Sequence, residues 1–314
     1  MPQASFVAGD WGTSNLRLFL CDAGGEVLER RAGPGAATSR EQFPRVFDSL
    51  VSDWMSSHGP LPAILCGMVG SNFGWVEARY VRCPARPEQI ASAAVCVNGR
   101  SVHIAPGLTC RNRFGAPDML RGEETQILGL LEKMPALRQG IHLLCLPGTH
   151  TKWIVLENGG VREFVTAATG EIFALLRSHS VLVPTESSTE ALDRTAFEKG
   201  LAQVDRFPRA QWLHRAFESR SRRLAGELAD DAAAAFQSGL LIGSDVTGAL
   251  QLFEGIADAE PVQLVGDPRL SALYSTALAS HGRESLRHDG EAASLAGLIH
   301  LHRLLSRDEA RHAV

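Results

Sequence analysis

The sequence predicts an α/β protein made of two related domains that face each other across a cleft. Its 314 residues exceed the usual size of one domain and suggest two domains of roughly 150 residues each. A run of strand, Gly-Thr turn, strand, Gly-Gly turn and strand begins near residue 5 and again near residue 141. We expect an N-terminal domain over 1–140, a C-terminal domain over 141–314, and a helix over 290–314 that packs back on the first domain.

The first domain is expected to open with an antiparallel meander. Apolar runs at Ser5–Ala8 and Leu16–Cys21 flank one glycine turn, and a second glycine turn leads to Glu26–Arg31. Glu41–Ser57 then shows apolar residues at the three- and four-residue spacing of a helix. A short buried strand, Ala63–Cys66, ends in a polar loop rich in glycine.

The rest of the chain repeats the strand meander and then turns helical. The expected elements are a helix over Thr125–Leu137, strands over Ile141–Leu146, Trp153–Leu156, Val161–Val165 and Pro261–Gly266, a mostly helical stretch over Ala191–Gly239, and helices over Ser271–His281 and Glu291–Leu305. No linker or low-complexity segment separates the two halves, so the boundary near residue 140 follows from the repeat and not from composition.

Composition argues against several classes of function. The net charge is −4 and no run of Lys or Arg stands out, so a nucleic-acid partner is not expected. The six cysteines include no C-x-x-C pair, which argues against a zinc site or a disulfide framework. The chain enters a strand directly at its N-terminus, and no apolar stretch reaches the ~18 residues of a membrane span. We expect a cytoplasmic protein without membrane attachment.

The first glycine turn is the sharpest candidate for a phosphate site. In Gly9-Asp10-Trp11-Gly12-Thr13-Ser14-Asn15-Leu16-Arg17, a tight hairpin brings backbone N–H groups close to an anion. Asp10 at the strand end is suited to hold Mg²⁺ through water. An ordinary hairpin is the alternative. The candidate nucleotide-binding residues here are Gly12, Thr13, Ser14, Asn15 and Arg17.

A second hairpin of the same kind occurs at Leu146–Lys152. Gly148 and Thr149 are the expected phosphate contacts. Lys152 can add a point charge for phosphate, and an exposed strand lysine is the equally weighted alternative. His150 is either a donor to the substrate or a structural residue of the turn. Two such hairpins are what a kinase needs to grip a triphosphate between its domains.

The pattern Asp10-x-Gly12-Thr13-x-x-x-Arg17 resembles the first phosphate motif of sugar kinases in the actin/hexokinase-like superfamily. More narrowly, the chain resembles the 2-dehydro-3-deoxygalactonokinase family. Further blocks of likeness lie at residues 67–75 (GMVGSNFGW), 121–126 (RGEETQ), 147–153 (PGTHTKW), 169–171 (TGE) and 238–243 (SGLLIG). The resemblance implies a two-domain actin/hexokinase-like (ribonuclease H-like) fold with an interdomain cleft, and Mg·ATP as the phosphoryl donor. It also implies phosphorylation of 2-dehydro-3-deoxy-D-galactonate at its terminal hydroxyl, giving the 6-phosphate in galactonate catabolism.

The resemblance implies a catalytic carboxylate just before the second hairpin. Glycerol-kinase-like relatives carry their catalytic Asp in a Gly-Asp-Gln-Gln block at this place, and Glu123 of Gly122-Glu123-Glu124-Thr125-Gln126 falls at the Asp position. A kinase needs such a carboxylate to orient the attacking hydroxyl and accept its proton. Glu124 and Asp118 remain alternative bases, and a capped helix start is the structural reading of the block.

The polar loop Gly67–Trp75 is expected to form the floor of the sugar site. Ser71 and Asn72 can bind hydroxyls and Trp75 can cover a sugar face, although a surface loop with Trp75 in the core is equally compatible. The carboxylate of a sugar acid calls for an arginine, because guanidinium binds carboxylates bidentately. The candidates are Arg79, Arg82, Arg86 and Arg121, with Arg86 held in a Pro-rich stretch.

Residues late in the chain are candidates for the adenosine site. Gly266 and Asp267 end a strand and start a helix where related kinases place a Gly-rich turn against adenosine, but Pro268 replaces a backbone donor there. Thr169 and Glu171, which follow the second hairpin, either face the cleft or cap a helix.

Three alternatives stay open on sequence alone. A kinase of another sugar acid, such as 2-dehydro-3-deoxygluconate, is the first alternative, since no motif resolves one stereocentre. A phosphoanhydride hydrolase of the same fold would activate water and would not need the Asn72/Trp75 loop. A non-catalytic scaffold or sugar-sensing regulator is disfavoured, because Asp10 leaves no room upstream for a DNA-binding segment. A homodimer is compatible with the sequence.

Overall fold

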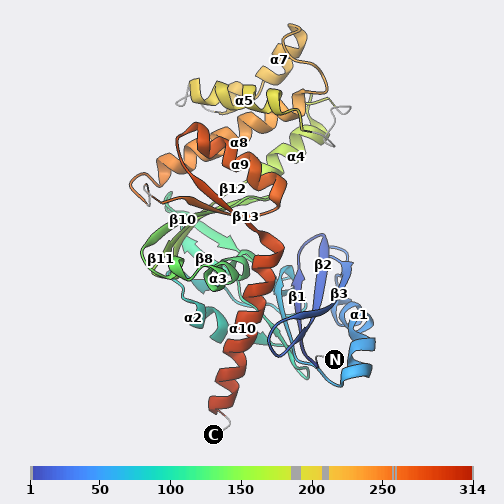
Figure 1. Cartoon of the computed structure of the whole chain (residues 1–314). Coiled ribbons are helices and arrows are strands. Elements are labelled where there is room, and N and C mark those ends of the chain that lie inside the picture. Colours follow the sequence, from blue (N-terminus) through green and yellow to red (C-terminus); the bar gives the residue numbers. More distant parts are fainter. Residues whose placement is uncertain (1–2, 185–191, 207–211, 257, 259, 313–314) are drawn as a thin grey trace. The chain divides into compact units, whose positions relative to one another are not determined.

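The chain folds into two compact units in a computed structural model that describes residues 3–184, 192–206, 212–256, 258 and 260–312 (Figure 1). The first unit comprises the chain up to Gly140, Leu156–Phe164 and the chain from Asp289 onward. The second comprises Ile141–Val155 and Val165–His288. Each unit has its own hydrophobic core.

The first unit is built on a six-stranded sheet with the order β3-β2-β1-β4-β7-β6. Its strands are β1 Ala4–Trp11, β2 Asn15–Asp22, β3 Val27–Pro34, β4 Ala63–Gly67, β6 Val95–Cys96 and β7 Val102–Ile104. β1, β2 and β3 pair antiparallel, as the predicted meander requires, whereas β4 pairs parallel to both β1 and β7. The parallel pairing places the ends of β1 and β4 side by side, with Asp10 opposite Cys66.

Helices and a small second sheet complete the first unit. They are α1 Phe43–His58, η1 Met68–Gly70, α2 Pro87–Ser92, α3 Glu123–Lys133, η2 Pro135–Arg138, α10 Gly290–His312, and the strands β5 Val81–Arg82, β8 Leu108–Arg111 and β9 Pro117–Leu120. α1 buries Phe43, Phe47, Val51 and Trp54, so the predicted helical spacing is confirmed. The small sheet β5-β8-β9 has strands of two to four residues and was not predicted.

α10 packs on α3 with backbones almost in contact, and glycine makes this possible. A Cβ on Gly129 of α3 would lie 1.8 Å from the Ala293 carbonyl oxygen, and one on Gly297 of α10 would lie 1.8 Å from that of Thr125. Only glycine on both helices allows this approach. The close packing fixes the start of α3 against the C-terminal helix, whose last expected residues, 313–314, lie outside the described residues.

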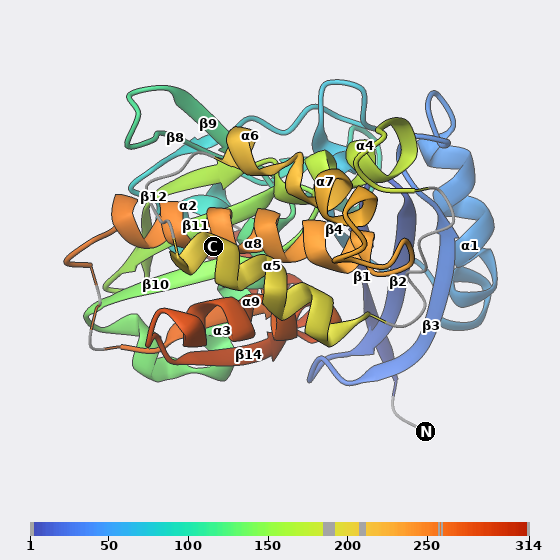
Figure 2. The ribbon, with the colours of Figure 1, turned by 90° about the horizontal axis from the view of Figure 1, so that it is seen from above.

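The second unit carries a five-stranded sheet with the order β12-β11-β10-β13-β14. Its elements are β10 Ile141–Leu146, β11 Thr151–Glu157, β12 Gly160–Ala167, α4 Thr169–His179, α5 Arg194–Arg206, α6 Trp212–Arg215, α7 Glu218–Leu224, α8 Ala233–Leu252, β13 Val262–Gly266, α9 Pro268–Ser280 and β14 Ser285–Asp289. α8 and α9 cover one face of the sheet, and α5 lies on the outer side of α8 (Figures 1 and 2). The mostly helical stretch expected over 191–239 is confirmed for its described part, while residues 191 and 207–211 lie outside it.

The two sheets share a strand order that reflects the repeat in the sequence. In the first, β3-β2-β1 is followed by β4, parallel to β1; in the second, β12-β11-β10 is followed by β13, parallel to β10. The predicted relation between the two halves is therefore confirmed at the level of topology. Among the described residues, no helix has the length and apolar character needed to cross a membrane.

Candidate active site

The first hairpin, between β1 and β2, has its carbonyl groups engaged and its side chains exposed. The turn is closed by the Gly12 N–H, which donates to the Asn15 carbonyl oxygen over 3.0 Å. The carbonyls of Gly12, Thr13 and Ser14 accept from the amides of Ala36, Ala37 and Gly35 at 2.9, 3.0 and 3.2 Å. A Cβ on Gly35 would lie 2.2 Å from the Ser14 carbonyl carbon, so only glycine fits there. A turn whose carbonyls are held from behind can present N–H groups to an anion.

Asp10 lies at the end of β1 among charges from three other elements. Its carboxylate is 3.6 Å from the Arg17 guanidinium and 3.8 Å from the Cys66 thiol. Burial raises the pKa of Asp10, Arg17 opposes this, and the charges of Glu123 and Glu291 raise it further. Arg17 also lies 3.5 Å from Glu291 at the start of α10. Asp10 of β1 and Glu291 of α10 thus both lie beside the Arg17 guanidinium, and Glu291 also pairs with Arg30 at 2.9 Å.

A carboxylate at this position suits Mg²⁺, which proteins usually hold through one or two carboxylates together with substrate phosphates. Asp10 lies beside the hairpin, and its contact with Mg²⁺ stays a prediction. Within the described part of the chain, no three His, Cys, Asp or Glu side chains gather as a metal site.

At the start of α3, the two adjacent glutamates that the sequence left as alternatives have different surroundings. Gly122, at φ 102°, turns the chain, and each carboxylate reaches back to a preceding amide. Glu123 accepts from the Arg121 N–H at 3.0 Å and Glu124 from the Gly122 N–H at 2.6 Å. Glu124 is fully buried, and burial together with Glu123 raises its pKa to about 8. Glu124 therefore holds a proton at neutral pH, whereas Glu123 is half-buried.

Asp118, the third candidate base, lies in β9 of the small sheet. Its carboxylate accepts from the Asn112 side-chain amide at 3.1 Å and from the Met119 N–H at 2.9 Å. Of the three candidates, Glu123 is the one whose charge raises the pKa of Asp10. Glu123 is therefore the candidate whose charge acts on Asp10, and its role as the base stays a prediction.

The loop expected to hold the sugar has both buried and exposed members. Ser71 is buried and Asn72 is exposed. Trp75 packs against Phe47 of α1 with ring centroids 5.5 Å apart. This contact agrees with the alternative in which Trp75 packs in the core. Asn72 is thus the polar side chain of this loop that faces solvent, and the substrate contacts of all three stay predictions.

The candidate arginines occupy different surroundings. The Arg121 guanidinium lies 4.4 Å from the centre of the Tyr80 ring and donates to the Ala78 carbonyl at 2.7 Å. A Cβ on Gly70 would lie 2.9 Å from Arg121 Nη1, so this side chain packs against the loop Gly67–Trp75. Arg86 instead lines a separate pocket of about 310 Å³ with Gln89, Asn158 and Arg162. Arg79 and Arg82 are exposed.

The second hairpin, between β10 and β11, rests directly on the start of α4. The Glu171 N–H donates to the Thr149 carbonyl at 2.9 Å. A Cβ on Gly170 would lie 2.4 Å from the Gly148 carbonyl oxygen, so this contact requires glycine. His150 Nε2 lies 2.8 Å from a Glu171 carboxylate oxygen, which ties the turn to the helix from outside.

Lys152 is buried and donates from Nζ to the His150 carbonyl at 3.0 Å. Its charge therefore lies at the base of the hairpin, and its contact with a phosphate stays a prediction.

Beneath this hairpin lies a hydrogen-bonded network that sequence reasoning missed. The Asp245 carboxylate of α8 accepts from Trp153 Nε1 at 2.9 Å, Thr169 Oγ1 at 2.7 Å and Tyr274 Oη at 2.6 Å. Tyr274 Oη also lies 2.8 Å from Thr151 Oγ1. The signal in the sequence was a single acid within the apolar run of α8, since even a partly buried carboxylate requires partners.

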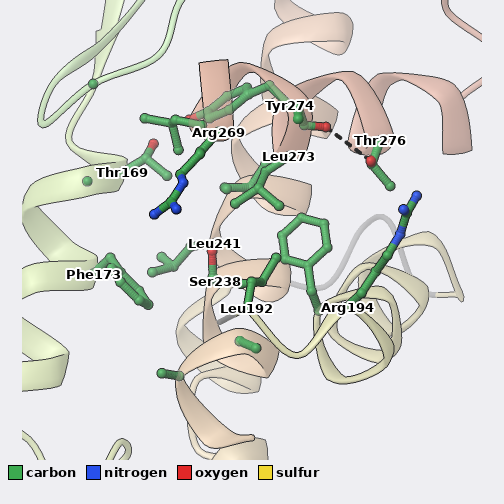
Figure 3. A pocket seen from close by; sticks show the side chains of 18 residues that line it. Thr169, Phe173, Leu192, Arg194, Ser238, Leu241, Arg269, Leu273, Tyr274 and Thr276 are labelled. Carbon is green, nitrogen blue, oxygen red and sulfur yellow. Dashed lines mark hydrogen bonds between the residues drawn. The ribbon is translucent and has the colours of Figure 1, made fainter. Parts of the chain in front are cut away.

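The same elements enclose a pocket of about 590 Å³ (Figure 3). Gly148, Thr169 and Gly170 form one end of it, where the second hairpin meets α4. Its apolar wall consists of Phe173, Leu241, Ile242, Leu270 and Leu273. The pocket thus combines an apolar chamber with a glycine hairpin and a helix start, and helix starts favour anions.

Gly266 and Asp267 lie at the start of α9, one of the helices that form this pocket. The Asp267 carboxylate caps α9 by accepting from the Arg269 and Leu270 amides at 2.9 and 3.0 Å. Gly266 faces the Pro147 carbonyl, which a Cβ would approach to 3.2 Å. The lining comes from the helix that follows, including Arg269 and Tyr274. Nucleotide contact by Gly266 and Asp267 stays a prediction.

Comparison with solved structures identifies the fold. A Sinorhizobium meliloti protein proposed to be a 2-dehydro-3-deoxygalactonokinase matches with a TM-score of 0.87 and 37% identity, over 95% of this chain and 98% of its own. The Clostridium difficile activator of 2-hydroxyisocaproyl-CoA dehydratase matches with a TM-score of 0.52 at 12% identity, over 98% of this chain and 97% of its own. The predicted actin/hexokinase-like fold is confirmed.

Sequence relatives cover almost the entire chain. A Rhizobium meliloti (strain 1021) protein named as a probable 2-dehydro-3-deoxygalactonokinase is 38% identical over 93% of this chain and 95% of its own length. The 2-dehydro-3-deoxygalactonokinase of Escherichia coli (strain K12) is 31% identical over 94% and 96%. The family model for 2-keto-3-deoxy-galactonokinase matches residues 10–301. The chain belongs to the 2-keto-3-deoxy-galactonokinase family.

Proposed function

We propose that the protein is an ATP-dependent kinase that phosphorylates 2-dehydro-3-deoxy-D-galactonate at its terminal hydroxyl, in galactonate catabolism. Family membership over residues 10–301 supports the reaction and the substrate. The observation in the structure that carries the proposal is the pocket of the second unit. Its lining combines an apolar wall with Gly148 of the second hairpin and with Thr169 and Gly170 at the start of α4. An adenine base needs the apolar part, and a phosphate chain needs amide groups at the end.

The residues of the first unit have roles that fit the same reaction. The first hairpin presents Thr13, Ser14 and Asn15 to phosphate oxygens, and Asp10 would hold Mg²⁺. When bound, Mg²⁺ neutralises charge that develops on the transferred phosphoryl group. Arg17 holds the Asp10 carboxylate in place by its ion pair.

We assign Glu123 as the general base for the attacking hydroxyl. It would orient the hydroxyl and accept its proton, which requires an ionised carboxylate. Glu124 is protonated at neutral pH because its pKa is about 8, and Asp118 is engaged by Asn112. Glu123 is half-buried and lies near the charge of Asp10, which supports the assignment.

For the sugar acid we propose Asn72 as a hydroxyl contact and Arg121 as the cation of the site. Arg121 lies against the sugar loop and precedes Glu123 by two residues, which favours it over Arg86 in its separate pocket. Ser71 and Trp75 would support the loop. His150 of the second hairpin would donate a hydrogen bond to the sugar acid.

A coupled assay of ADP release tests the proposal. Mg·ATP is offered with the galactonate-derived acid, the gluconate-derived acid, glycerol or water alone, and rates are compared. Turnover with the galactonate-derived acid far above the others is the expected result. Equal or faster turnover with the gluconate-derived acid would reassign the substrate, and ADP release without an acceptor would favour a phosphoanhydride hydrolase.

We place the reaction in the cytoplasm, where ATP is formed. The homodimer stays a prediction, and light scattering of the purified protein measures it directly.

A further inference from the structure

The pocket of the second unit is lined by positive charge without negative charge. Arg194 and Arg269 are its charged lining residues, and no Asp or Glu stands among the described residues that line it. The remaining lining is apolar or carries hydroxyl groups, as at Ser238 and Thr276. An anionic ligand is therefore favoured here over a neutral one.

The two arginines differ in whether the guanidinium already forms an ion pair within the protein. Arg194 Nε lies 3.1 Å from a Glu198 carboxylate oxygen, one turn away on α5. The Arg269 side chain has no ion pair or hydrogen bond with any residue in the described part of the chain. Its guanidinium projects from α9 into the pocket on the side of Thr169 (Figure 3). Arg269 can therefore take up a ligand without breaking an existing pair.

We propose that Arg269 binds the phosphate groups of the nucleotide. The inference rests on the proposed function, which places ATP in this pocket. A guanidinium presents parallel N–H groups that match phosphate oxygens, and charge-assisted hydrogen bonds of this kind are stronger than neutral ones. Thr169, Gly148 and Gly170 form the end of the pocket suited to phosphates, and Arg269 lies on the same side as Thr169.

Equilibrium binding of ADP and of adenosine separates a phosphate contact from other roles. Arg269→Met keeps an unbranched apolar stem and removes the guanidinium with its charge, and it should weaken ADP binding by about tenfold to a hundredfold. Adenosine binding should stay within about twofold, because adenosine carries no phosphate. Arg269→Lys should retain part of the ADP affinity, since lysine keeps the charge but loses the bidentate geometry. In turnover, the KM for ATP should rise while the KM for the sugar acid stays constant.

Arg194→Met is the matched control, because it removes a guanidinium of the same pocket that Glu198 already pairs. It should change ADP affinity by less than about threefold, on the scale of an exposed helix ion pair. An equal loss of ADP affinity in both variants would show that the positive charge of the pocket as a whole matters and not a contact of Arg269. This result would overturn the proposal. An equal loss of ADP and adenosine affinity in Arg269→Met would overturn it as well, since the contact would then lie with the nucleoside.

The outcome for the wild-type protein separates this inference from the proposed function. If the wild-type protein binds no ADP, both are wrong. If it binds ADP and turns over, and Arg269→Met does the same with unchanged constants, only the role of Arg269 is wrong.

Discussion

Asp245 and Tyr274 form the shortest hydrogen bond in the network beneath the second hairpin, with the tyrosine hydroxyl donating to the carboxylate over 2.6 Å. The same carboxylate oxygen accepts from Thr169. Thr169 and Tyr274 both line the pocket, so one carboxylate of α8 holds residues of α4 and α9 at the pocket wall. Because a partly buried carboxylate is costly without partners, each of these donors contributes to the stability of the network.

Asp245→Asn should weaken the hydrogen bonds that hold Thr169 and Tyr274 at the pocket wall, with little change in the volume of the side chain. An asparagine amide offers one acceptor oxygen and replaces the other with an N–H donor, so one of three donors would face another donor. We expect a loss of about 1–3 kcal/mol in the free energy of unfolding, measured by denaturant titration. The KM for ATP should rise severalfold, while the KM for the sugar acid should not change.

Tyr274→Phe provides the control for Asp245, because it removes one donor and keeps the ring. It should lower stability by less than Asp245→Asn. Wild-type stability and an unchanged KM for ATP in Asp245→Asn would show that the network does not position the pocket.

Glu123→Gln should lower kcat by roughly two decades or more, the usual scale for loss of a general base. Steady-state kinetics with saturating ATP and sugar acid measure this. Glu124→Gln should keep most of the activity, because Glu124 is already protonated at neutral pH. A large loss in Asp118→Asn with near-normal turnover in Glu123→Gln would move the base to β9.

Stability should depend on pH through Glu124. Its pKa is about 8 in the fold against an ordinary value of 4.5, so between these values the folded protein holds a proton that the unfolded chain has lost. The free energy of unfolding then falls as pH rises, by about 1.4 kcal/mol per pH unit from this one group. The stabilisation is complete below the unfolded pKa and is lost as pH rises through the folded pKa.

Denaturant titrations of the wild type and Glu124→Gln at several pH values isolate this effect. The stability of the wild type relative to the variant should decline from about pH 5 to about pH 8 and then level off. A constant difference across this range would mean that Glu124 is ionised in the fold.

Gly170→Ala should displace the second hairpin from α4. The added methyl group would lie 2.4 Å from the Gly148 carbonyl oxygen and 2.8 Å from the Thr149 Cα, both backbone atoms. A cost of about 1–3 kcal/mol in unfolding free energy is expected, together with a higher KM for ATP. Gly248→Ala, on the exposed face of α8 with no atom within 4 Å of the added Cβ, is the matched control. It should preserve or raise stability, because alanine is the better helix former. Equal melting temperatures for Gly170→Ala and Gly248→Ala would contradict the prediction.

Elements with strong local signals were predictable. The hairpins of β1–β2 and β10–β11 follow from glycine turns between apolar runs, and α1 from its apolar spacing, because both signals lie within a short segment. The strands β5, β8 and β9 escaped prediction since two to four residues are too few to show an alternation. α3 was expected over Thr125–Leu137 but runs from Glu123 to Lys133, because Gly122 lets it begin earlier and Pro135 ends it.

The sequence by itself determined the family and the two glycine hairpins, because these depend on residue type and order within short blocks. Only the tertiary structure decided which neighbouring glutamate is buried and that Arg86 and Arg121 have different surroundings. It also decided that Arg269 lines the pocket and that Asp245 binds two of the pocket's lining residues. The physical reason is that burial, hydrogen bonding and the pairing of charge arise between segments far apart in the chain. Asp245 of α8 acquires its role from Thr169 and Tyr274, and no local pattern around any of the three records their contact.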